Sequence, residues 1–249
     1  MELFVADLIE RFYTALWPFL RIGAMLIAVP VLSIDAVSVR IRVILTLALT
    51  LMIYPLVDWP TIDPVSAAGL SEIFNQILIG VLMGFFLQIV TAAVVLAGQA
   101  IANSMGLAMA TMVDPGIGTV PLMSQFLLIL GTLIFLGVGG HVLMIGILLR
   151  SFETFPVGVA FISGANFTAL VEWSAMIFLG GMLMALPVLV ALLLVNIGVG
   201  VMTRAAPSLN IFAVGFPVFF LTGYAVLILS MAGIGARIQW LWMEGIERV

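Results

Sequence analysis

The stretch VMTRAAPSLNIFAVGFP, from Val201 to Pro217, places an arginine and two prolines between two long apolar segments. We expect Arg204 in the last turn of the first segment, where a cation complements the exposed carbonyl groups of a helix end. Pro207 cannot continue a helix because it lacks a backbone N–H group, and Ser208 or Asn210 can cap the helix that follows. The stretch therefore predicts a helical hairpin with a polar tip.

Polar and small residues extend this pattern on both sides of the tip. Asn196, Gly200 and Arg204 follow one another at steps of four, which predicts a polar stripe along one face of the first helix. Gly215 and Pro217 are expected to kink the second helix near its start. The two predicted arms are Phe178 to Arg204 and Asn210 to Ala236.

The composition is that of a membrane protein or of a subunit seated in a membrane assembly. Of 249 residues, 64% are hydrophobic and only 8% are charged, with a mean hydropathy of +1.36. A soluble domain of this length could not cover its surface with so few polar side chains. All eight basic residues are arginine and the net charge is -4, which indicates neither a nucleic-acid partner nor an anionic-lipid patch. The absence of cysteine excludes thiolate metal sites, disulfides and thiol catalysis.

Six apolar segments of very different length predict an all-α chain. Drawn as straight helices at about 1.5 Å per residue, the third would reach roughly 60 Å and the second only about 22 Å, against about 30 Å of hydrocarbon. Such unequal helices fit better in a bundle of protein neighbours than as separate crossings. Polar connections are expected at Asp58 to Glu72 and at Arg150 to Glu172. The apolar segments are Phe12 to Ile34, Val43 to Val57, Ile73 to Val113, Pro115 to Leu149, Trp173 to Thr203 and Ala205 to Ala236.

The third segment carries one small and polar helical face. Small residues let helix backbones approach closely, and amide side chains can form hydrogen bonds across the contact. Helix packing is the favoured interpretation, and the lining of a hydrated path is the alternative. The face consists of Gly80, Gly84, Gln88, Thr91, Gly98, Gln99 and Asn103.

A stripe of methionines runs from this segment toward a loop that proline and glycine residues predict. Met105, Met109 and Met112 share one helical face by their spacing. Spacing alone favours ordinary core filling, whereas the adaptable methionine side chain could also close around an irregular partner. The loop lies between charge-free runs and is expected inside protein or over a cavity, because irregular backbone cannot face lipid. Its residues include Val113, Asp114, Pro115, Gly116, Gly118 and Pro121.

Arg21 and His141 are isolated titratable residues and therefore candidate functional groups. Arg21 is the sole charge between Phe12 and Ile34, so it needs a partner from another helix or subunit, and structural pairing is favoured over work on a substrate. His141 is the only histidine and lacks neighbouring acids. The acidic residues lie outside the centres of the apolar blocks, so no catalytic group, metal site or cofactor is predicted.

Four motifs in order resemble the FliR family of flagellar type III export-gate proteins. The pattern R-x-x-P-x-x-N-I-F-x-x-G-F-P begins at Arg204, and it is preceded by WPFLRIGAMLIAVPVL, GLAMATMVDPGIGTVP and FLGVGGH. Ser208 stands where many members have glutamine, and Thr111 where serine is common. The motif residues at the hairpin are Arg204, Pro207, Asn210, Ile211, Phe212, Gly215, Phe216 and Pro217.

The resemblance implies a non-enzymatic pore subunit that passes unfolded flagellar proteins across the bacterial inner membrane. Residues 1–175 would be similar to FliP and residues 176–249 to FliQ, within a helical assembly at the flagellar basal body that is raised partly out of the bilayer. Segment 106–121 would be the plug of the pore. The hairpin tip, with Asn196 and Gly200 leading to it, would contact FliQ and FlhB homologues. FliP homologues, export substrates and membrane lipid would be the other partners.

Two functions of other classes stay open from the residues alone. A secondary transporter of small molecules would bind one defined solute and work without related subunits. An intramembrane enzyme would need a nucleophile and a base within reach of each other, with His141 as its last candidate.

Overall fold

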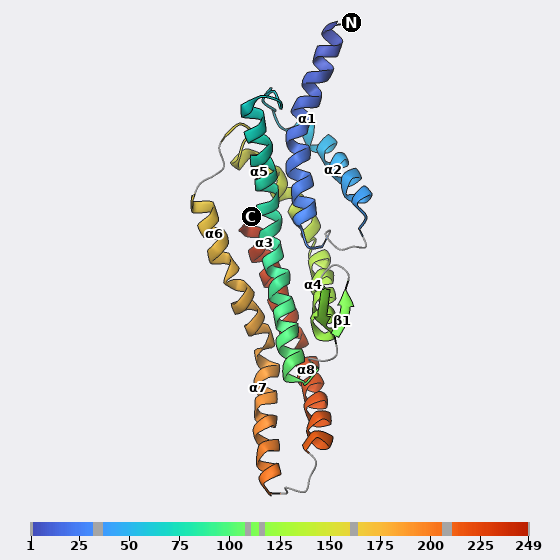
Figure 1. Ribbon diagram of the computed structural model, residues 1–249, viewed down its shortest axis with the longest axis vertical. Coiled ribbons are helices and arrows are strands. Elements are labelled where there is room, and N and C mark those ends of the chain that lie inside the picture. Colours follow the sequence, from blue (N-terminus) through green and yellow to red (C-terminus); the bar gives the residue numbers. More distant parts are fainter. Residues whose placement is uncertain are drawn as a thin grey trace. The chain divides into compact units, whose positions relative to one another are not determined.

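The computed structural model describes residues 2–31, 37–107, 111–114, 118–159, 164–205 and 211–248. Side chains are described throughout these ranges except at residues 2–7, 111–114, 118–120, 164–167 and 211–214. Long helices make up nearly all of the described chain (Figure 1). The elements are α1 Glu2–Ala28, α2 Val39–Ile53, the 3-10 helix η1 Tyr54–Leu56, α3 Ala67–Ser104, β1 Thr111–Asp114, β2 Gly118–Pro121, α4 Leu122–Gly137, α5 Gly140–Thr154, α6 Gly164–Ser174, α7 Met176–Ala205 and α8 Ile211–Glu247.

The prediction of a helical chain is confirmed, with one addition. Strands β1 and β2 form a two-stranded antiparallel sheet inside the segment predicted as a loop. Four paired residues per strand are too few for an alternating pattern to stand out in a sequence that is apolar almost everywhere.

The first compact unit contains Met1–Gln88, His141–Trp173 and Gly245–Val249. It therefore holds α1, α2, η1, the first part of α3, α5 and α6. Gly80 and Gly84 make its closest helix contact. A Cβ atom at Gly80 would lie 2.3 Å from the Arg21 carbonyl oxygen, and one at Gly84 would lie 2.4 Å from the Ala28 Cβ. The packing interpretation of this part of the small-residue face is confirmed.

The second compact unit contains Ile89–Gly140 and Ser174–Glu244. It holds the rest of α3, the β1–β2 hairpin, α4, α7 and most of α8. Trp242 anchors its core, because its Nε1 donates to the Gly131 carbonyl oxygen at 3.0 Å and its ring lies 4.6 Å from that of Phe135. The predicted division at residue 175, into a FliP-like part and a FliQ-like part, stays a prediction.

The six apolar segments do not correspond to six crossings, in agreement with their unequal predicted lengths. Among the described residues, four stretches are long and apolar enough to cross a membrane, or up to five if a bent pair counts as one span. The bent pair is α4 with α5, turned by 66° where Gly139 adopts φ +77°. Pro115 to Leu149 is therefore not one straight segment. The four stretches are Val39–Leu56, Ala67–Ser104, Thr168–Ala205 and Gly215–Glu247.

The two predicted connections are shorter than expected. The first ends at Ser66, whose Oγ accepts a hydrogen bond from Gly69 N at 3.0 Å and so caps the start of α3. The second was predicted as a long loop over Arg150 to Glu172, and this was wrong. Helix α5 continues to Thr154 and α6 occupies Gly164–Ser174, so Gly164 and Asn166 lie within a helix, whereas Pro156 and Gly158 lie in the turn that follows α5.

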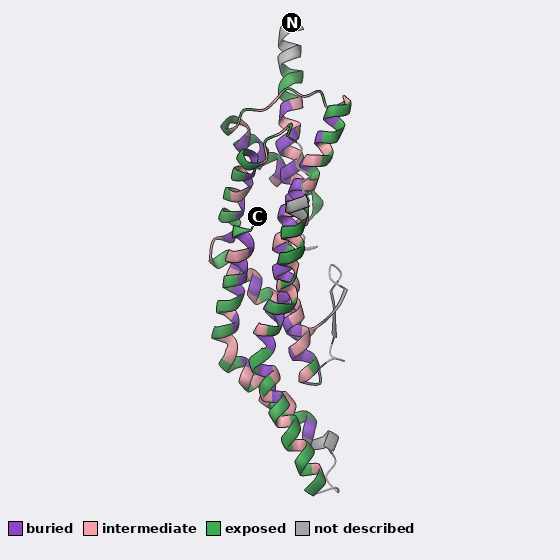
Figure 2. Cartoon of the chain, turned by 90° about the vertical axis from the view of Figure 1, so that its left-hand side faces the viewer, coloured by how far each residue is buried: buried purple, intermediate pink, exposed green. Residues whose placement is uncertain are grey.

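Exposed residues run along the long helices (Figure 2), and many of them have large apolar side chains. On α7 the exposed fractions include 67% for Phe178 and 66% for Leu194, and on α8 83% for Leu229. A single chain in water would not leave so much apolar area uncovered. Lipid or other protein must cover these faces.

Candidate functional site

Helix α3 ends in a Schellman motif at the start of the predicted plug. Gly106 has φ +75°, its N–H donates to the Asn103 carbonyl oxygen at 3.2 Å, and Leu107 N–H donates to that of Ala102 at 2.8 Å. Glycine takes this left-handed conformation without the strain that a Cβ atom adds. The predicted helical continuation to Val113 was therefore wrong. Met112 lies in β1, so the three methionines do not share a helical face.

The described residues of the predicted plug segment 106–121 lie between α3 and α4 and include no helix. Its strands pair Thr111 with Pro121 and Asp114 with Gly118, and the hairpin lies beside α4 (Figure 1). Of the predicted plug residues, Met112, Val113 and Asp114 belong to β1 and Gly118 to β2. Met109, Pro115 and Gly116 lie outside the described residues.

The base of this segment is seated on α8. Met105 is fully buried, and a Cβ atom at Gly223 would lie 2.6 Å from the Met105 Cγ, so a larger residue at position 223 would displace the Met105 side chain. One residue on, a Cβ atom at Gly106 would lie 3.6 Å from the Phe216 ring. The structure thus brings the start of the predicted plug together with Phe216 of the predicted hairpin site.

Sequence reasoning missed the residues of α8 that complete this contact. Phe220 stacks on Phe216 with ring centroids 6.2 Å apart, and Tyr224 follows Phe220 at 4.7 Å. Their spacing of four residues is the signal that would have found them, because it places three aromatic rings in a row on one helix face. Gly223 carried no comparable signal among 24 glycines.

The stripe that leads to the hairpin tip faces outward. Asn196, Gly200 and Arg204 are all exposed on α7, and a Cβ atom at Gly200 would meet nothing within 4 Å. Arg204 lies in the last turn of α7, as predicted. Because the described part of this chain does not cover the stripe, the three residues are available to a neighbour.

The remaining hairpin residues divide into described and undescribed positions. Pro207 and Asn210 lie outside the described residues. Phe212 is placed in α8 by its backbone, Gly215 is buried, and Phe216 is 50% exposed. Pro217 is exposed within α8.

Arg21 has its partners within this chain. Its guanidinium is fully buried and makes four hydrogen bonds: Nε to Gln76 Oε1 at 2.7 Å, Nη1 to the Ser151 carbonyl oxygen at 2.7 Å and to Ser151 Oγ at 3.1 Å, and Nη2 to the Phe155 carbonyl oxygen at 2.7 Å. The Phe152 ring lies 4.2 Å from Arg21 Cζ. The cation therefore caps the carboxyl end of α5, where the carbonyl dipoles favour positive charge.

A glutamine joins Arg21 to the nearest buried carboxylate. Gln76 Nε2 donates to Glu72 Oε1, one turn earlier on α3, while Gln76 Oε1 accepts from Arg21. Glu72 is only 4% exposed and Gln76 is fully buried. Since buried opposite charges without hydrogen-bonded partners are costly, this relay satisfies both groups at once. We refer to Arg21, Gln76, Glu72, Ser151 and Phe152 as the arginine cluster.

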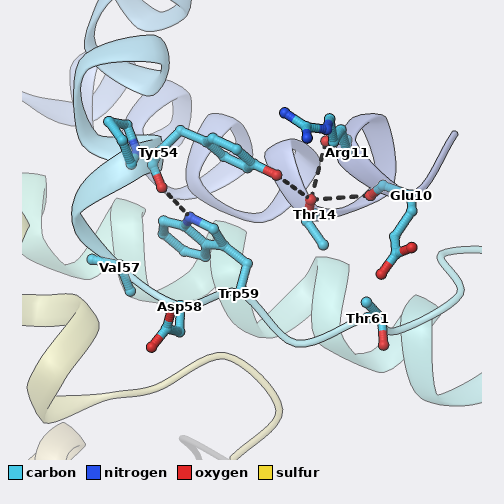
Figure 3. Close-up of a pocket in the computed structure, with 9 residues that line it drawn as sticks. Glu10, Arg11, Thr14, Tyr54, Val57, Asp58, Trp59 and Thr61 are labelled. Carbon is cyan, nitrogen blue, oxygen red and sulfur yellow. Dashed lines mark hydrogen bonds between the residues drawn. The ribbon is translucent and has the colours of Figure 1, made fainter. Parts of the chain in front are cut away.

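A polar pocket of about 400 Å³ lies near the arginine cluster in the same unit (Figure 3). Tyr54 Oη and Thr14 Oγ1 share a hydrogen bond of 2.8 Å, and Trp59 Nε1 donates to the Tyr54 carbonyl oxygen at 2.8 Å. These bonds tie α1 to the turn that follows α2. The pocket is lined by Glu10, Arg11, Thr14, Tyr54, Pro55, Val57, Asp58, Trp59 and Thr61.

The described residues include no group of three or more histidine, aspartate or glutamate side chains that could hold a metal ion. His141 is exposed at the start of α5. The candidate site is thus built from packing, backbone turns and one buried cation rather than from reactive groups.

Comparison with known proteins places the chain in a family. The sequence profile of bacterial export proteins, family 1, matches residues 12–245. The flagellar biosynthetic protein FliR of Pectobacterium carotovorum subsp. carotovorum is 37% identical over 222 residues, covering 89% of this chain and 85% of the relative. FliR of Escherichia coli strain K12 is 34% identical over 229 residues, covering 92% and 88%. FliR of Bacillus subtilis strain 168 is 28% identical over 231 residues, covering 91% and 89%.

The profile spans both compact units, from the first turns of α1 to the last turns of α8. It includes the arginine cluster, the whole of segment 106–121 and the hairpin tip. The chain belongs to the FliR family of flagellar biosynthetic proteins.

Proposed function

We propose that this chain is a gate subunit of the flagellar type III export apparatus, and that segment 106–121 closes the pore through which unfolded proteins pass. The observation that carries the proposal is the seating of this segment. The paired strands β1 and β2 follow α3 and precede α4 along the chain, and Met105 and Gly106, where α3 ends, pack against α8. Non-helical backbone is tolerated at membrane depth only inside protein or along a water-filled cavity.

The hairpin suits a gate because it can be displaced at low cost. An isolated two-stranded hairpin is marginally stable in water, so its position depends on what packs against it. Met105 at its base is unbranched and can repack, whereas the helices on either side are long and regular. Many different unfolded chains must slide through such a pore, and tight specific contacts would stall them. The proposal therefore assigns no catalysis and no cofactor to this chain.

The proposal includes assembly with related subunits. The part up to residue 175 would resemble FliP and the α7–α8 hairpin would resemble FliQ, with FliP, FliQ and FlhB homologues as neighbours. The exposed apolar faces of α7 and α8 and the uncovered polar stripe on α7 support this, because both leave area for other chains to bury. The assembly would sit in the inner membrane at the basal body, raised partly out of the bilayer.

Arg204→Ala tests the contribution of the stripe to assembly. We expect about five- to tenfold less complex with the neighbouring subunits, because arginine truncations are prominent among interface hot spots. The amount of chain in the membrane should not change, since Arg204 is exposed at a helix end. Native mass spectrometry after mild detergent extraction measures the complex, and immunoblotting measures the chain.

Arg150→Ala is the matched control, because Arg150 is also exposed near the end of a helix but belongs to α5 and not to the stripe. Complexes recovered in equal amounts from the Arg204 variant and the control would count against this contact. Recovery of the wild-type chain without any related subunit would instead favour the small-molecule transporter.

A further inference from the structure

We propose that the outward face of α2 binds an anionic phospholipid, with Arg40 at the phosphate and the aliphatic side chains of α2 along the acyl chains. This inference concerns the first compact unit and goes beyond the gate function. The exposed aliphatic side chains of α2, the charge of Arg40 and the length of Val39–Leu56 support it.

Helix α2 exposes large aliphatic side chains on its outward face, whereas its buried face holds two threonines beside Leu49 and Ile53. Its buried face includes Thr46 and Thr50, and Thr46 Cγ2 would be 3.4 Å from a Cβ atom at Gly23 of α1. Both hydroxyls donate to carbonyl oxygens of α2 itself, Thr46 to Arg42 at 2.7 Å and Thr50 to Thr46 at 2.7 Å. The inward polar groups are thus satisfied, while the outward side chains are aliphatic. This distribution is the one expected where the outer solvent is hydrocarbon.

The outward face forms a continuous stripe headed by a cation. Arg40, Ile44, Leu47 and Leu51 are spaced by four, three and four residues, which puts them on one side of the helix. Arg40 is exposed, and the exposed fractions of Ile44 and Leu51 are 66% and 67%. A guanidinium at the end of an aliphatic stripe matches a phospholipid, whose phosphate and acyl chains present the same two chemistries in the same order.

The length of the apolar stretch that contains α2 is close to the hydrocarbon thickness of a bilayer. Val39–Leu56 comprises 18 residues, or roughly 27 Å at about 1.5 Å per residue, close to the hydrocarbon thickness of about 30 Å. At the other end the helix is held by protein, because Tyr54 Oη shares a hydrogen bond with Thr14 Oγ1 and Trp59 Nε1 donates to the Tyr54 carbonyl oxygen.

Lipid retention by the purified full-length chain, with any subunits that copurify, tests the proposal. The probes are phosphatidylglycerol and phosphatidylcholine of identical acyl chains, added in detergent and counted as bound lipids by native mass spectrometry. We expect tighter binding of phosphatidylglycerol, and about fivefold weaker binding of that lipid in Arg40→Gln, since one basic residue near an anionic surface contributes about that factor. Ile44→Asn on the same stripe should weaken the binding of both lipids.

Arg150→Gln is the control, because it removes an exposed arginine near a helix end of the same unit. Equal retention of the two lipids by the wild-type chain would overturn the proposal. An equal loss in the Arg40 and Arg150 variants would also overturn it, because the effect would then follow net charge and not this face. A copurified subunit that covers α2 and leaves lipid binding unchanged in Ile44→Asn would replace lipid as the occupant.

Discussion

Arg21→Met is expected to lower the Tm of the purified chain by about 6–20 °C. Removing one member of a buried charged network costs about 3–5 kcal/mol, and each kcal/mol shifts the Tm of a chain of this size by about 2–4 °C. The loss leaves Gln76 Oε1 and the Phe155 carbonyl oxygen without their arginine donors, and it removes the cation that offsets Glu72. Thermal unfolding in detergent, followed by tryptophan fluorescence, measures the change.

Matched variants separate the cluster from a general effect of charge. Arg150→Met removes an exposed arginine from α5 and should change the Tm little. Arg21→Lys keeps the charge but loses the planar guanidinium that reaches Gln76, Ser151 and Phe155. Its Tm should therefore lie between those of Arg21→Met and Arg150→Met. Adding Glu72→Gln to Arg21→Met should recover part of the loss, since both charges are then gone. Equal Tm values for the methionine variants at positions 21 and 150 would contradict the structural role of the cluster.

Deletion of Gly106 to Gly118 should make the inner membrane leaky to ions while export of flagellar proteins continues. The deletion removes the left-handed glycine that ends α3, the whole of β1 and the first residue of β2, but leaves α4 intact. If this segment closes the pore, the helices around it still form the conduit. Conductance of planar bilayers that contain the purified complex measures the leak, and secretion of export substrates measures transport.

The neighbouring subunits provide the control for the deletion. The leak should require their presence, because one chain does not enclose a pore in this account. A leak from the deleted chain alone would indicate damage to the bilayer and not an open gate. Unchanged conductance of the complete complex would remove the plug assignment from segment 106–121.

The α7–α8 hairpin was predictable because its signals are local. The arms expected at Phe178 to Arg204 and from Asn210 correspond to α7 Met176–Ala205 and to the start of α8 at Ile211. Proline, a cation in the last turn and a run of apolar residues act within a few residues of each other. The end of α8 was missed by eleven residues, since the helix continues through the polar residues Arg237, Gln239 and Glu244.

The arginine cluster and strands β1 and β2 could not be predicted from the sequence, because local signals were absent or misleading there. The partners of Arg21 stand 55, 130 and 134 residues away, and no local pattern connects them. The methionine spacing misled because helical periodicity continues in the sequence beyond Gly106, where the Schellman motif already ends the helix. The left-handed conformation of Gly106 ends the helix, although the spacing of Met105, Met109 and Met112 predicted that it would continue.

A cryo-EM map of the complex extracted with a tagged copy of this chain tests the central claim most directly. The account predicts related subunits around this chain and segment 106–121 lying across the conduit that they enclose. A map in which this chain stands alone in lipid, with segment 106–121 away from any conduit, would contradict it.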